Sequence, residues 1–440
     1  MTTLRPQTRP TTIPGPTGSP LFGMARAIRH DLLGTLLEGF RRYGDVVSYP
    51  IGPPRGPRRL RQNVVALHHP DAVHQILTNA RDFGRETVAF GVLAEMIGDG
   101  LLTSDGETWT RQRRTLQPLF TPRRVVGYTD LMAAEADRIV GRSGGGAVDL
   151  HALMQQYTLR VVGRALFGDD VDDAVAELRA LVPLSGDLVV GRTMQLARLP
   201  LGLSTPGNAR FTRVRARLYG IVERILSRRA GAGETADDMV GRLHAARDPE
   251  TGAPLSTQEI RDQLLVFLLA GHETTAGALT FTLHLLGRHP EVQDRVAADP
   301  DLARAAVLEG MRLYPPVPAT ERMVTVDTDL GGYPVAAGTV AVAAQWVTHR
   351  HPEFWPAPET FDIDRFVGTH DRPRYAYFPF GGGPRSCVGE HFSVLEATVL
   401  LNAVLARYRV AALDPRVPLM TLVTLRPAAP VRASLIRRSG

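Results

Sequence analysis

The chain has 440 residues, of which 44% are hydrophobic and 22% are charged, a composition typical of a folded globular protein. Its formal net charge of +6 is carried by arginine alone, because the sequence contains no lysine, and the arginines are scattered among 45 acidic residues. That distribution argues against a nucleic-acid-binding protein and favours a solvated surface with at most one basic face for an acidic partner. No apolar run approaches the roughly 20 residues of a membrane-spanning helix, so we expect no membrane anchor.

The chain is expected to begin with an extended lead-in, residues 1–20, followed by a single domain over residues 21–440. The lead-in is rich in proline and threonine and lacks the apolar core of a signal peptide. We therefore expect a cytoplasmic protein, and a single cysteine is in keeping with a reducing compartment.

The hydrophobic pattern predicts a mainly α chain with a minor β region. The first two thirds are mostly helical, with breaks where glycine and proline gather. In chain order, the predicted elements are a helix over Ala25–Tyr43, strands over Val46–Ile51 and Val64–Leu67, a helix from Val73, helical residues to Gly287 with breaks at 144–146, 200–207 and 231–234, strands within 322–342, a coil over 352–380, and a helix over 390–408.

The longest predicted helix starts at a capping box. Ser256 and Glu259 can each accept a hydrogen bond from a backbone N–H of the first turn, and Leu255 can pack on Ile260. The helical pattern then continues to about Gly287, which gives a helix of roughly 30 residues and about 45 Å.

The middle of this helix carries Ala270-Gly271-His272-Glu273-Thr274-Thr275. Glycine within a helix costs about 1 kcal/mol relative to alanine, and threonine can bond to a carbonyl one turn earlier and bend the helix. The combination of glycine, acid and threonine predicts a helix that opens for a ligand, although back-bonding by the threonines alone stays possible. A metalloprotease helix is excluded because no histidine stands four residues after His272, which we expect to be structural or solvent-facing.

The only cysteine, Cys387, lies in Phe380-Gly-Gly-Gly-Pro-Arg-Ser-Cys-Val-Gly389, just before the last long helix. It cannot form an internal disulfide. The helix start and Arg385 favour a thiolate, and the glycines allow backbone conformations closed to other residues and the close approach of a flat group. A phosphate-binding loop is excluded because no GK[ST] follows the glycines. A metal ligand and a buried structural cysteine stay open.

Two further spacings place charged or aromatic side chains one helical turn apart. Trp109 and Arg113 form a W-x-x-x-R pattern, and Glu309 and Arg312 form an E-x-x-R pattern. Taken alone, the first is compatible with a solvated basic face and the second with an exposed ion pair.

Together these motifs resemble the cytochrome P450 family. Phe380, Gly383, Arg385, Cys387 and Gly389 match every fixed position of the family's heme-binding loop, F-x-x-G-x-R-x-C-x-G, and the mid-helix segment matches its A-G-x-E-T-T. The resemblance implies the family's fold, a mainly α triangular prism with heme b (iron protoporphyrin IX) between the long central helix and the cysteine loop. It also implies that Cys387 is the proximal ligand of the heme iron.

The resemblance implies roles for the other motif residues. Thr274 and Glu273 would be catalytic, in the delivery of protons to O2, while Ala270 and Gly271 would leave room for heme. Phe380 would pack near the sulfur. The residues implied to bind the heme propionates are Trp109, Arg113, Arg322 and Arg385, and the charge network implied to hold the cysteine loop in place is Glu309, Arg312 and Arg365.

The resemblance implies a monooxygenase that uses O2 and electrons from a separate ferredoxin and ferredoxin reductase to hydroxylate or epoxidise a lipophilic small molecule. A bacterial natural-product intermediate, above all a terpenoid, is the favoured substrate, and a monomer is expected. The alternatives are a fatty-acid hydroxylase, a peroxide-driven peroxygenase and a non-catalytic heme-binding sensor; the last two would not need the acid–alcohol pair. The residues expected to contact substrate, or else to be ordinary core, are Phe90, Val266, Phe267, Val317 and Met420.

Overall fold

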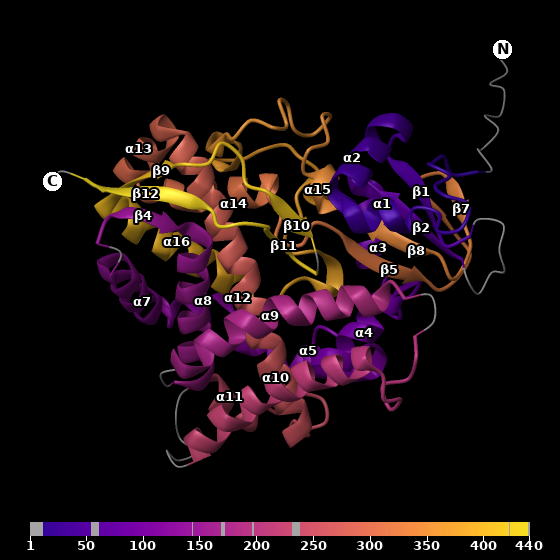
Figure 1. The fold of residues 1–440 in the computed structure, drawn as a ribbon, viewed down its shortest axis with the longest axis horizontal. Helices are drawn as coiled ribbons and strands as arrows, with labels where there is room; N and C mark the ends of the chain where they lie inside the picture. Colours follow the sequence, from indigo (N-terminus) through magenta and orange to yellow (C-terminus); the bar gives the residue numbers. More distant parts are fainter. Residues whose placement is uncertain are drawn as a thin grey trace. The chain divides into compact units, whose positions relative to one another are not determined.

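The computed structural model describes residues 12–53, 61–142, 144–168, 172–195, 198–230, 238–421 and 423–438. Backbone packing separates a first unit (Met1–Thr87, Pro318–Glu359, Asp371–Ser386) from a second unit (Val88–Val317, Thr360–His370, Cys387–Gly440). Figure 1 shows the elements of both, coloured along the sequence. The single domain expected over residues 21–440 stays a prediction, and residues 1–11 of the expected lead-in lie outside the described residues.

The first unit is built on a five-stranded sheet in the order β1-β2-β8-β5-β3. The middle strand, β8, consists of valine and alanine alone, as expected for a strand that is buried between neighbours. Helix α3 packs Val73 and Ile76 into the same core cluster as Val65 and Leu67 of β2. The strands of this unit are β1 (Val46–Ile51), β2 (Gln62–Leu67), β3 (Phe83–Gly84), β5 (Thr320–Val324), β6 (Thr328–Leu330), β7 (Tyr333–Val335) and β8 (Val340–Ala343).

The single helix predicted over Ala25–Tyr43 is wrong, because the structure has two helices there. Asp31 separates them: its backbone is extended, and its carboxylate accepts a hydrogen bond at 2.8 Å from the backbone N–H of Gly34, which caps the second helix. The helices of this unit are α1 (Ala25–His30), α2 (Leu32–Tyr43), α3 (Pro70–Thr78) and α15 (Gln345–Thr348), with 3-10 turns η4 (Arg374–Ala376) and η5 (Gly383–Arg385).

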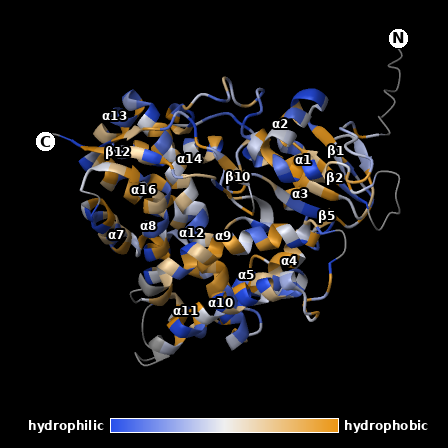
Figure 2. Cartoon of the chain, viewed as in Figure 1, coloured by the Kyte–Doolittle hydropathy of each residue, from blue (hydrophilic) through white to orange (hydrophobic). Residues whose placement is uncertain are grey.

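The second unit is mostly helical, and both hydrophilic and hydrophobic residues are visible along helices such as α9 and α10 (Figure 2). Its helices are α4 (Val88–Ile97), α5 (Gly106–Leu116), α6 (Pro122–Val126), α7 (Thr129–Arg142), α8 (Leu150–Phe167), α9 (Asp172–Thr193), α10 (Pro206–Ala230), α11 (Met239–Ala245), α12 (Thr257–Arg288), α13 (Pro290–Ala298), α14 (Leu302–Leu313) and α16 (Glu390–Arg407), with 3-10 turns η2 (Gln117–Phe120) and η3 (Ile363–Phe366).

Helix α12 is the longest described helix, with 32 residues, and it packs against α8, α10, α14, α16 and strand β9. The predicted capping box is confirmed: the Ser256 hydroxyl accepts from the N–H of Glu259, and the Glu259 carboxylate accepts from the N–H of Ser256. Within the described residues this helix is long and apolar enough to cross a bilayer, but 72% of its most apolar window is buried in the protein, as in a core helix.

The second unit also holds the strands β4 (Gly146–Asp149), β9 (Tyr408–Ala412), β10 (Leu419–Thr421), β11 (Leu425–Pro427) and β12 (Arg432–Arg437). They form a three-stranded sheet, β4-β12-β9, and a hairpin, β10-β11. Strand β4 was not predicted, because glycine at 144–146 indicates only a break. The break predicted at 231–234 lies outside the described residues. The mainly α class with a minor β region is confirmed.

Candidate active site

Cys387 follows η5 in the chain and stands just before the first turn of α16. Burial raises the pKa of its thiol above the ordinary value. Two effects lower this pKa: the backbone N–H groups of Gly389 and Glu390 donate hydrogen bonds to the sulfur, and the guanidinium of Arg113 adds a positive charge. The expectation that local chemistry favours a thiolate is therefore only half right, since the helix start supplies donors but burial outweighs them. A metal cation at the sulfur would reverse that balance, because a coordinating thiol loses its proton outright.

The Cys387 side chain is nevertheless exposed by its accessible surface. Protein atoms crowd the sulfur enough to raise its pKa, and the residue still keeps accessible surface. A ligand can therefore reach Cys387.

The glycines before the cysteine are required by their backbone conformation or by close neighbours. Gly381 and Gly383 have φ angles of 70° and 66°, in the left-handed region that favours glycine. A Cβ on Gly383 would lie 2.0 Å from the carbonyl oxygen of Leu77 at the end of α3, and one on Gly382 would lie 2.4 Å from the Tyr375 ring. Both neighbours belong to the first unit. These contacts explain Gly382 and Gly383 without a ligand.

The mid-helix segment of α12 is accessible, although residues on both sides of it are buried. Ala270 is exposed, and Gly271, Glu273 and Thr274 are half-buried, between the buried stretches 262–268 and 275–286. The Thr274 hydroxyl donates to the Ala270 carbonyl at 2.6 Å, so the back-bonding considered from the sequence does occur. It occurs in a stretch whose small side chains leave one face of the helix open.

Two residues of this segment point away from the open face. A Cβ on Gly271 would lie 3.3 Å from Val162 of α8, so this glycine makes room for helix packing. His272 is 1% exposed, and burial lowers its pKa to about 3. The solvent-facing alternative for His272 is therefore wrong, and the structural one holds.

Glu273 is held by a residue that no sequence motif indicated. Its Oε2 accepts a hydrogen bond at 2.9 Å from the hydroxyl of Thr424, which lies just before β11. Burial raises the pKa of Glu273 above its ordinary value, while Thr424 and the guanidinium of Arg426 act to lower it. Arg426 in turn pairs with Asp187 of α9 at 3.7 Å. The acid is thus connected through the β10-β11 hairpin to a carboxylate that is 55% exposed.

Ser393 is the second residue that sequence reasoning missed. Its hydroxyl lies 3.0 Å from that of Thr275, and this hydrogen bond joins α12 to the first turns of α16. The helix that carries the mid-helix acid is thereby held against the helix that begins beside Cys387. Both contacts are made between residues more than 100 positions apart, so a pattern read along the chain has no signal for them.

The predicted charge network is assembled within the second unit. Glu309 and Arg312 are both fully buried and form a two-pronged pair, with N–O distances of 2.6 and 2.7 Å. Arg312 also donates to the Thr360 carbonyl, and Glu309 accepts from the N–H of Asp362, which fixes the chain around η3. Arg365 of η3 reaches Glu309 at 3.7 Å. The exposed-ion-pair alternative is wrong.

The family model described as "Cytochrome P450" matches residues 13–304 and 297–432, nearly the whole chain. The chain is a cytochrome P450. It is 34% identical over 426 residues to cyclooctat-9-en-7-ol 5-monooxygenase of Streptomyces melanosporofaciens, covering 92% of this chain and 91% of the relative. It is 30% identical over 397 residues to pentalenene oxygenase of Streptomyces avermitilis, covering 85% and 86%.

Among solved structures, the heme domain of cytochrome P450DA superposes with a TM-score of 0.85 at 26% identity, over 97% of this chain and 98% of that one. The predicted cytochrome P450 fold is confirmed. The chain is accordingly a monooxygenase of this family and a heme protein.

The residues present suit a cytochrome P450's heme. A thiolate-type ligand needs a reachable sulfur with hydrogen-bond donors, and Cys387 has both. An open stretch of small side chains is present on α12 at Ala270. On α5, Arg113 stands one turn after Trp109, and its pKa is lowered by burial and raised by the charge of Cys387.

Arg111 and Arg114, the neighbours of Arg113 on α5, form ion pairs with other elements of the protein. Arg111 pairs with Glu259 at the start of α12, and Arg114 makes a two-pronged pair with the buried Asp248. These two arginines tie α5 to other elements, so the solvated-face alternative fails for them. Three other residues proposed to bind heme belong to the first unit: Arg322, Phe380 and Arg385. Arg322 is 3% exposed on β5, and Phe380 and Arg385 are half-buried in the coil that ends at η5.

The five residues considered for substrate contact differ in how deeply they are buried. Val266 and Phe267 lie in the main core cluster of the second unit, where the Phe267 ring makes an edge contact with Phe120. Val317 is half-buried. Val266 and Phe267 therefore fit the alternative that they are ordinary core residues.

Of the other two, Phe90 lies on α4, which packs against α12, and Met420 lies on β10, which pairs with β11. Phe90 is half-buried on α4, in a stretch predicted to be helical. Met420 is 37% exposed on β10, and its sulfur accepts a hydrogen bond from Arg426 at 3.2 Å. Met420, a candidate substrate contact, and Thr424, the hydrogen-bond partner of Glu273, thus belong to the same hairpin.

Proposed function

We propose that this monooxygenase holds heme b through Cys387 and inserts oxygen into a lipophilic, ring-containing terpenoid. The observation that carries the proposal is the open mid-helix stretch of α12, with Glu273 and Thr274, in the same unit as a reachable thiol that accepts two backbone hydrogen bonds. Heme with a thiolate ligand supplies the activation of O2 and the transfer of one oxygen atom to a C–H or C=C bond.

The substrate class rests on the relatives and on the composition of the candidate contacts. Two Streptomyces relatives have names that refer to cyclic terpenoids. The candidate contact residues Phe90, Val317 and Met420 are apolar, which suits a hydrocarbon skeleton. A fatty-acid hydroxylase is the second candidate, because the same apolar side chains would accept an acyl chain.

Glu273 and Thr274 would supply protons during turnover. Burial raises the pKa of Glu273, so its carboxyl can hold a proton nearer to neutral pH than an exposed glutamate does. The Thr274 hydroxyl donates to Ala270 and keeps its oxygen lone pairs available to accept from a proton donor. The pair distinguishes this proposal from a peroxide-driven peroxygenase, which needs no such delivery.

Electrons would come from a ferredoxin and its reductase, acting on a cytoplasmic monomer. Helix α6 packs against α16, the helix that begins beside Cys387, and its Arg123 and Arg124 are exposed. An acidic ferredoxin would be attracted to such a face. Reversing both charges (R123E/R124E) is expected to slow reduction by ferredoxin at least tenfold at low salt, whereas R29E, on α1, is expected to leave it unchanged. An unchanged rate in R123E/R124E would exclude this docking face.

The decisive experiment is an optical titration of the purified heme-loaded protein with cyclic terpenoids, fatty acids and steroids. We expect a Soret shift toward high spin with a terpenoid, and product only when ferredoxin, reductase and O2 are all present. Cys387→Ala is expected to abolish the thiolate-type Soret spectrum. A shift with fatty acids alone would move the assignment to the second candidate. Turnover with peroxide as fast as with ferredoxin would favour a peroxygenase, and heme binding without turnover would favour a sensor.

A further inference from the structure

Arg426 lies on the side of the β10-β11 hairpin that faces the acid of α12. Thr424 directly precedes β11 and Arg426 lies within it, so alternation along the extended chain places their side chains on the same side, about 7 Å apart. Leu425 between them points the other way: it is 1% exposed, and its N–H donates to the Pro316 carbonyl at 2.8 Å. Because Thr424 donates to Glu273 at 2.9 Å, the guanidinium of Arg426 is within reach of the same carboxylate.

The Arg426 guanidinium is nevertheless engaged elsewhere. It donates to the sulfur of Met420, its cross-strand partner on β10, at 3.2 Å, and lies 3.7 Å from the carboxylate of Asp187 on α9. Within the part of the chain that the structure describes, no hydrogen bond or ion pair joins Arg426 to Glu273. The Arg426 side chain is 11% exposed and that of Asp187 is 55% exposed. One arginine thus serves two acids, and it is paired with the outer one.

The charge of Arg426 still acts on Glu273. Burial raises the pKa of Glu273, while the hydrogen bond from Thr424 and the positive charge of Arg426 lower it. An opposite charge lowers the pKa of a carboxyl more strongly the closer it lies. The fraction of Glu273 that carries a proton therefore depends on how closely Arg426 approaches it.

The other titratable groups near this part of α12 are two buried histidines. Burial lowers the pKa of His272 to about 3 and that of His151, on α8, to about 4, so both are neutral at neutral pH. Asp149, the N-cap of α8, and Arg179, an exposed residue of α9, act on His151 in opposite directions. The charge that acts on Glu273 is that of Arg426.

We propose that Asp187 is a positioning residue for Glu273: it holds Arg426 toward solvent and so prevents a direct pair between that arginine and the acid. The proposal rests on the role in proton delivery proposed above for Glu273. A glutamate that is paired directly with an arginine stays ionised and has no proton to give, because the opposite charge favours the carboxylate. Asp187 thereby keeps a proton available at Glu273, although it acts only through Arg426.

The test is the pKa of Glu273, followed by its infrared carboxyl band in the heme-loaded protein, with Glu273→Gln to assign the band. For Asp187→Asn we expect this pKa to fall by at least about half a pH unit, because Arg426 turns to Glu273. For Arg426→Gln we expect it to rise by at least about half a pH unit, because the positive charge is lost. In D187N/R426Q the group through which Asp187 acts is missing, so the pKa should equal that in R426Q alone.

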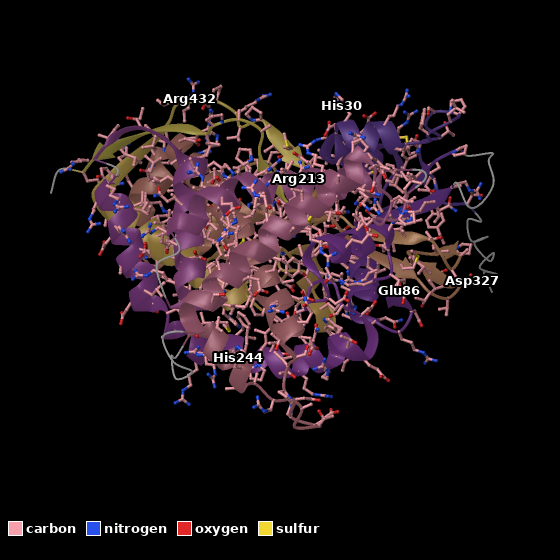
Figure 3. All side chains as sticks on the ribbon, turned by 60° about the horizontal axis from the view of Figure 1, so that its bottom comes forward. His30, Glu86, Arg213, His244, Asp327 and Arg432 are labelled. Atoms are coloured by element: carbon pink, nitrogen blue, oxygen red, sulfur yellow. The ribbon has the colours of Figure 1, made fainter. Side chains whose placement is uncertain are left out.

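Two controls separate this effect from a general change of charge. Glu177→Gln removes another carboxylate of α9, one that pairs with Arg217 and Arg224 of α10. Arg213→Gln removes an exposed arginine of α10, which Figure 3 labels. Both should leave the pKa of Glu273 unchanged, and an unchanged Soret spectrum in every variant verifies that the fold is intact.

Turnover across the pH range gives a second readout. Because a group with a lower pKa loses its proton at lower pH, the alkaline fall in turnover should move to lower pH in D187N and to higher pH in R426Q. A fall that does not follow the infrared pKa would overturn the role of Asp187 in proton delivery.

Two infrared results would overturn the placement of Arg426 by Asp187. One is an unchanged pKa of Glu273 in D187N, and the other is a decrease of the same size when Arg426 has already been replaced. Failure of the proposed function is a separate result, since a protein that oxidises no terpenoid still gives the infrared pKa of Glu273, which decides whether Asp187 acts through Arg426.

Discussion

The hydroxyl of Thr424 donates a hydrogen bond to Glu273 at 2.9 Å, and so ties the β10-β11 hairpin to the middle of α12. Arg426, two residues further along the same hairpin, adds a positive charge that also acts on Glu273. Burial therefore raises the pKa of Glu273, and the hairpin lowers it. A hairpin whose Thr424 is 151 residues away in sequence thus affects the pKa of the group proposed to deliver protons.

Thr424→Val should raise the pKa of Glu273, because it removes a hydrogen bond that favours the ionised carboxylate. With a higher pKa the group keeps its proton to higher pH, so the alkaline fall in turnover should move to higher pH. Product formation across the pH range and the infrared carboxyl band of Glu273 measure the two effects. Thr424→Ser keeps the hydroxyl and should behave like the parent; identical profiles for all three proteins would contradict the prediction.

The hydrogen bond between Thr275 and Ser393 should contribute to stability across the α12–α16 contact. Thr275 is 1% exposed, so Thr275→Val keeps the shape and leaves the Ser393 hydroxyl without this partner. We expect the free energy of unfolding to fall by about 1–3 kcal/mol. Urea unfolding of T275V, S393A and the double variant measures the coupling, which should be favourable. A double variant whose loss equals the sum of the single losses would show that the two hydroxyls do not interact.

The Glu309–Arg312 pair should be costly to break from either side. Both side chains are fully buried, so removing one charge leaves the other unpaired in the protein interior. For Glu309→Gln and Arg312→Met we expect a loss of about 3–5 kcal/mol in the free energy of unfolding, measured with urea. The exposed pair between Arg295 and Asp364 offers a matched control.

Breaking that control pair with Arg295→Gln should cost less than about 1 kcal/mol, because both partners are well exposed and solvent compensates for the lost contact. Equal losses in the buried and exposed pairs would mean that Glu309 and Arg312 do not depend on each other in the folded state.

The sequence predicted the elements whose signal is local. The capping box at Ser256 lies within four residues, and the E-x-x-R pattern within one helical turn, so neither needs a remote partner to be recognised. The helix break at Asp31 was also local but was missed, because an apolar pattern on both sides outweighed one capping residue.

What the sequence could not predict depends on segments that meet only in the fold. The F-x-x-G-x-R-x-C-x-G pattern around Cys387 is local, but the rise in the pKa of Cys387 is not, since the burial that causes it comes from residues elsewhere in the chain. Thr424 and Ser393 belong to no motif and act through partners on α12.

Glu396 on α16 should make the protein less stable as pH rises. It is fully buried, neither carboxylate oxygen has a hydrogen-bond partner among the described residues, and burial raises its pKa well above the ordinary value. Between the ordinary and the raised pKa the folded state binds more protons than the unfolded state. Stability therefore falls with rising pH in that window, by up to about 1.4 kcal/mol per pH unit.

Glu396→Gln removes this proton linkage and should stabilise the protein increasingly above the ordinary pKa of glutamate, with little effect in more acidic solution where both states carry the proton. Urea unfolding at a series of pH values from acidic to mildly alkaline measures the difference. Glu390→Gln, an exposed position in the first turn of the same helix, controls for the loss of one negative charge. Parallel stability curves for the parent and Glu396→Gln would mean that Glu396 releases its proton equally easily in both states.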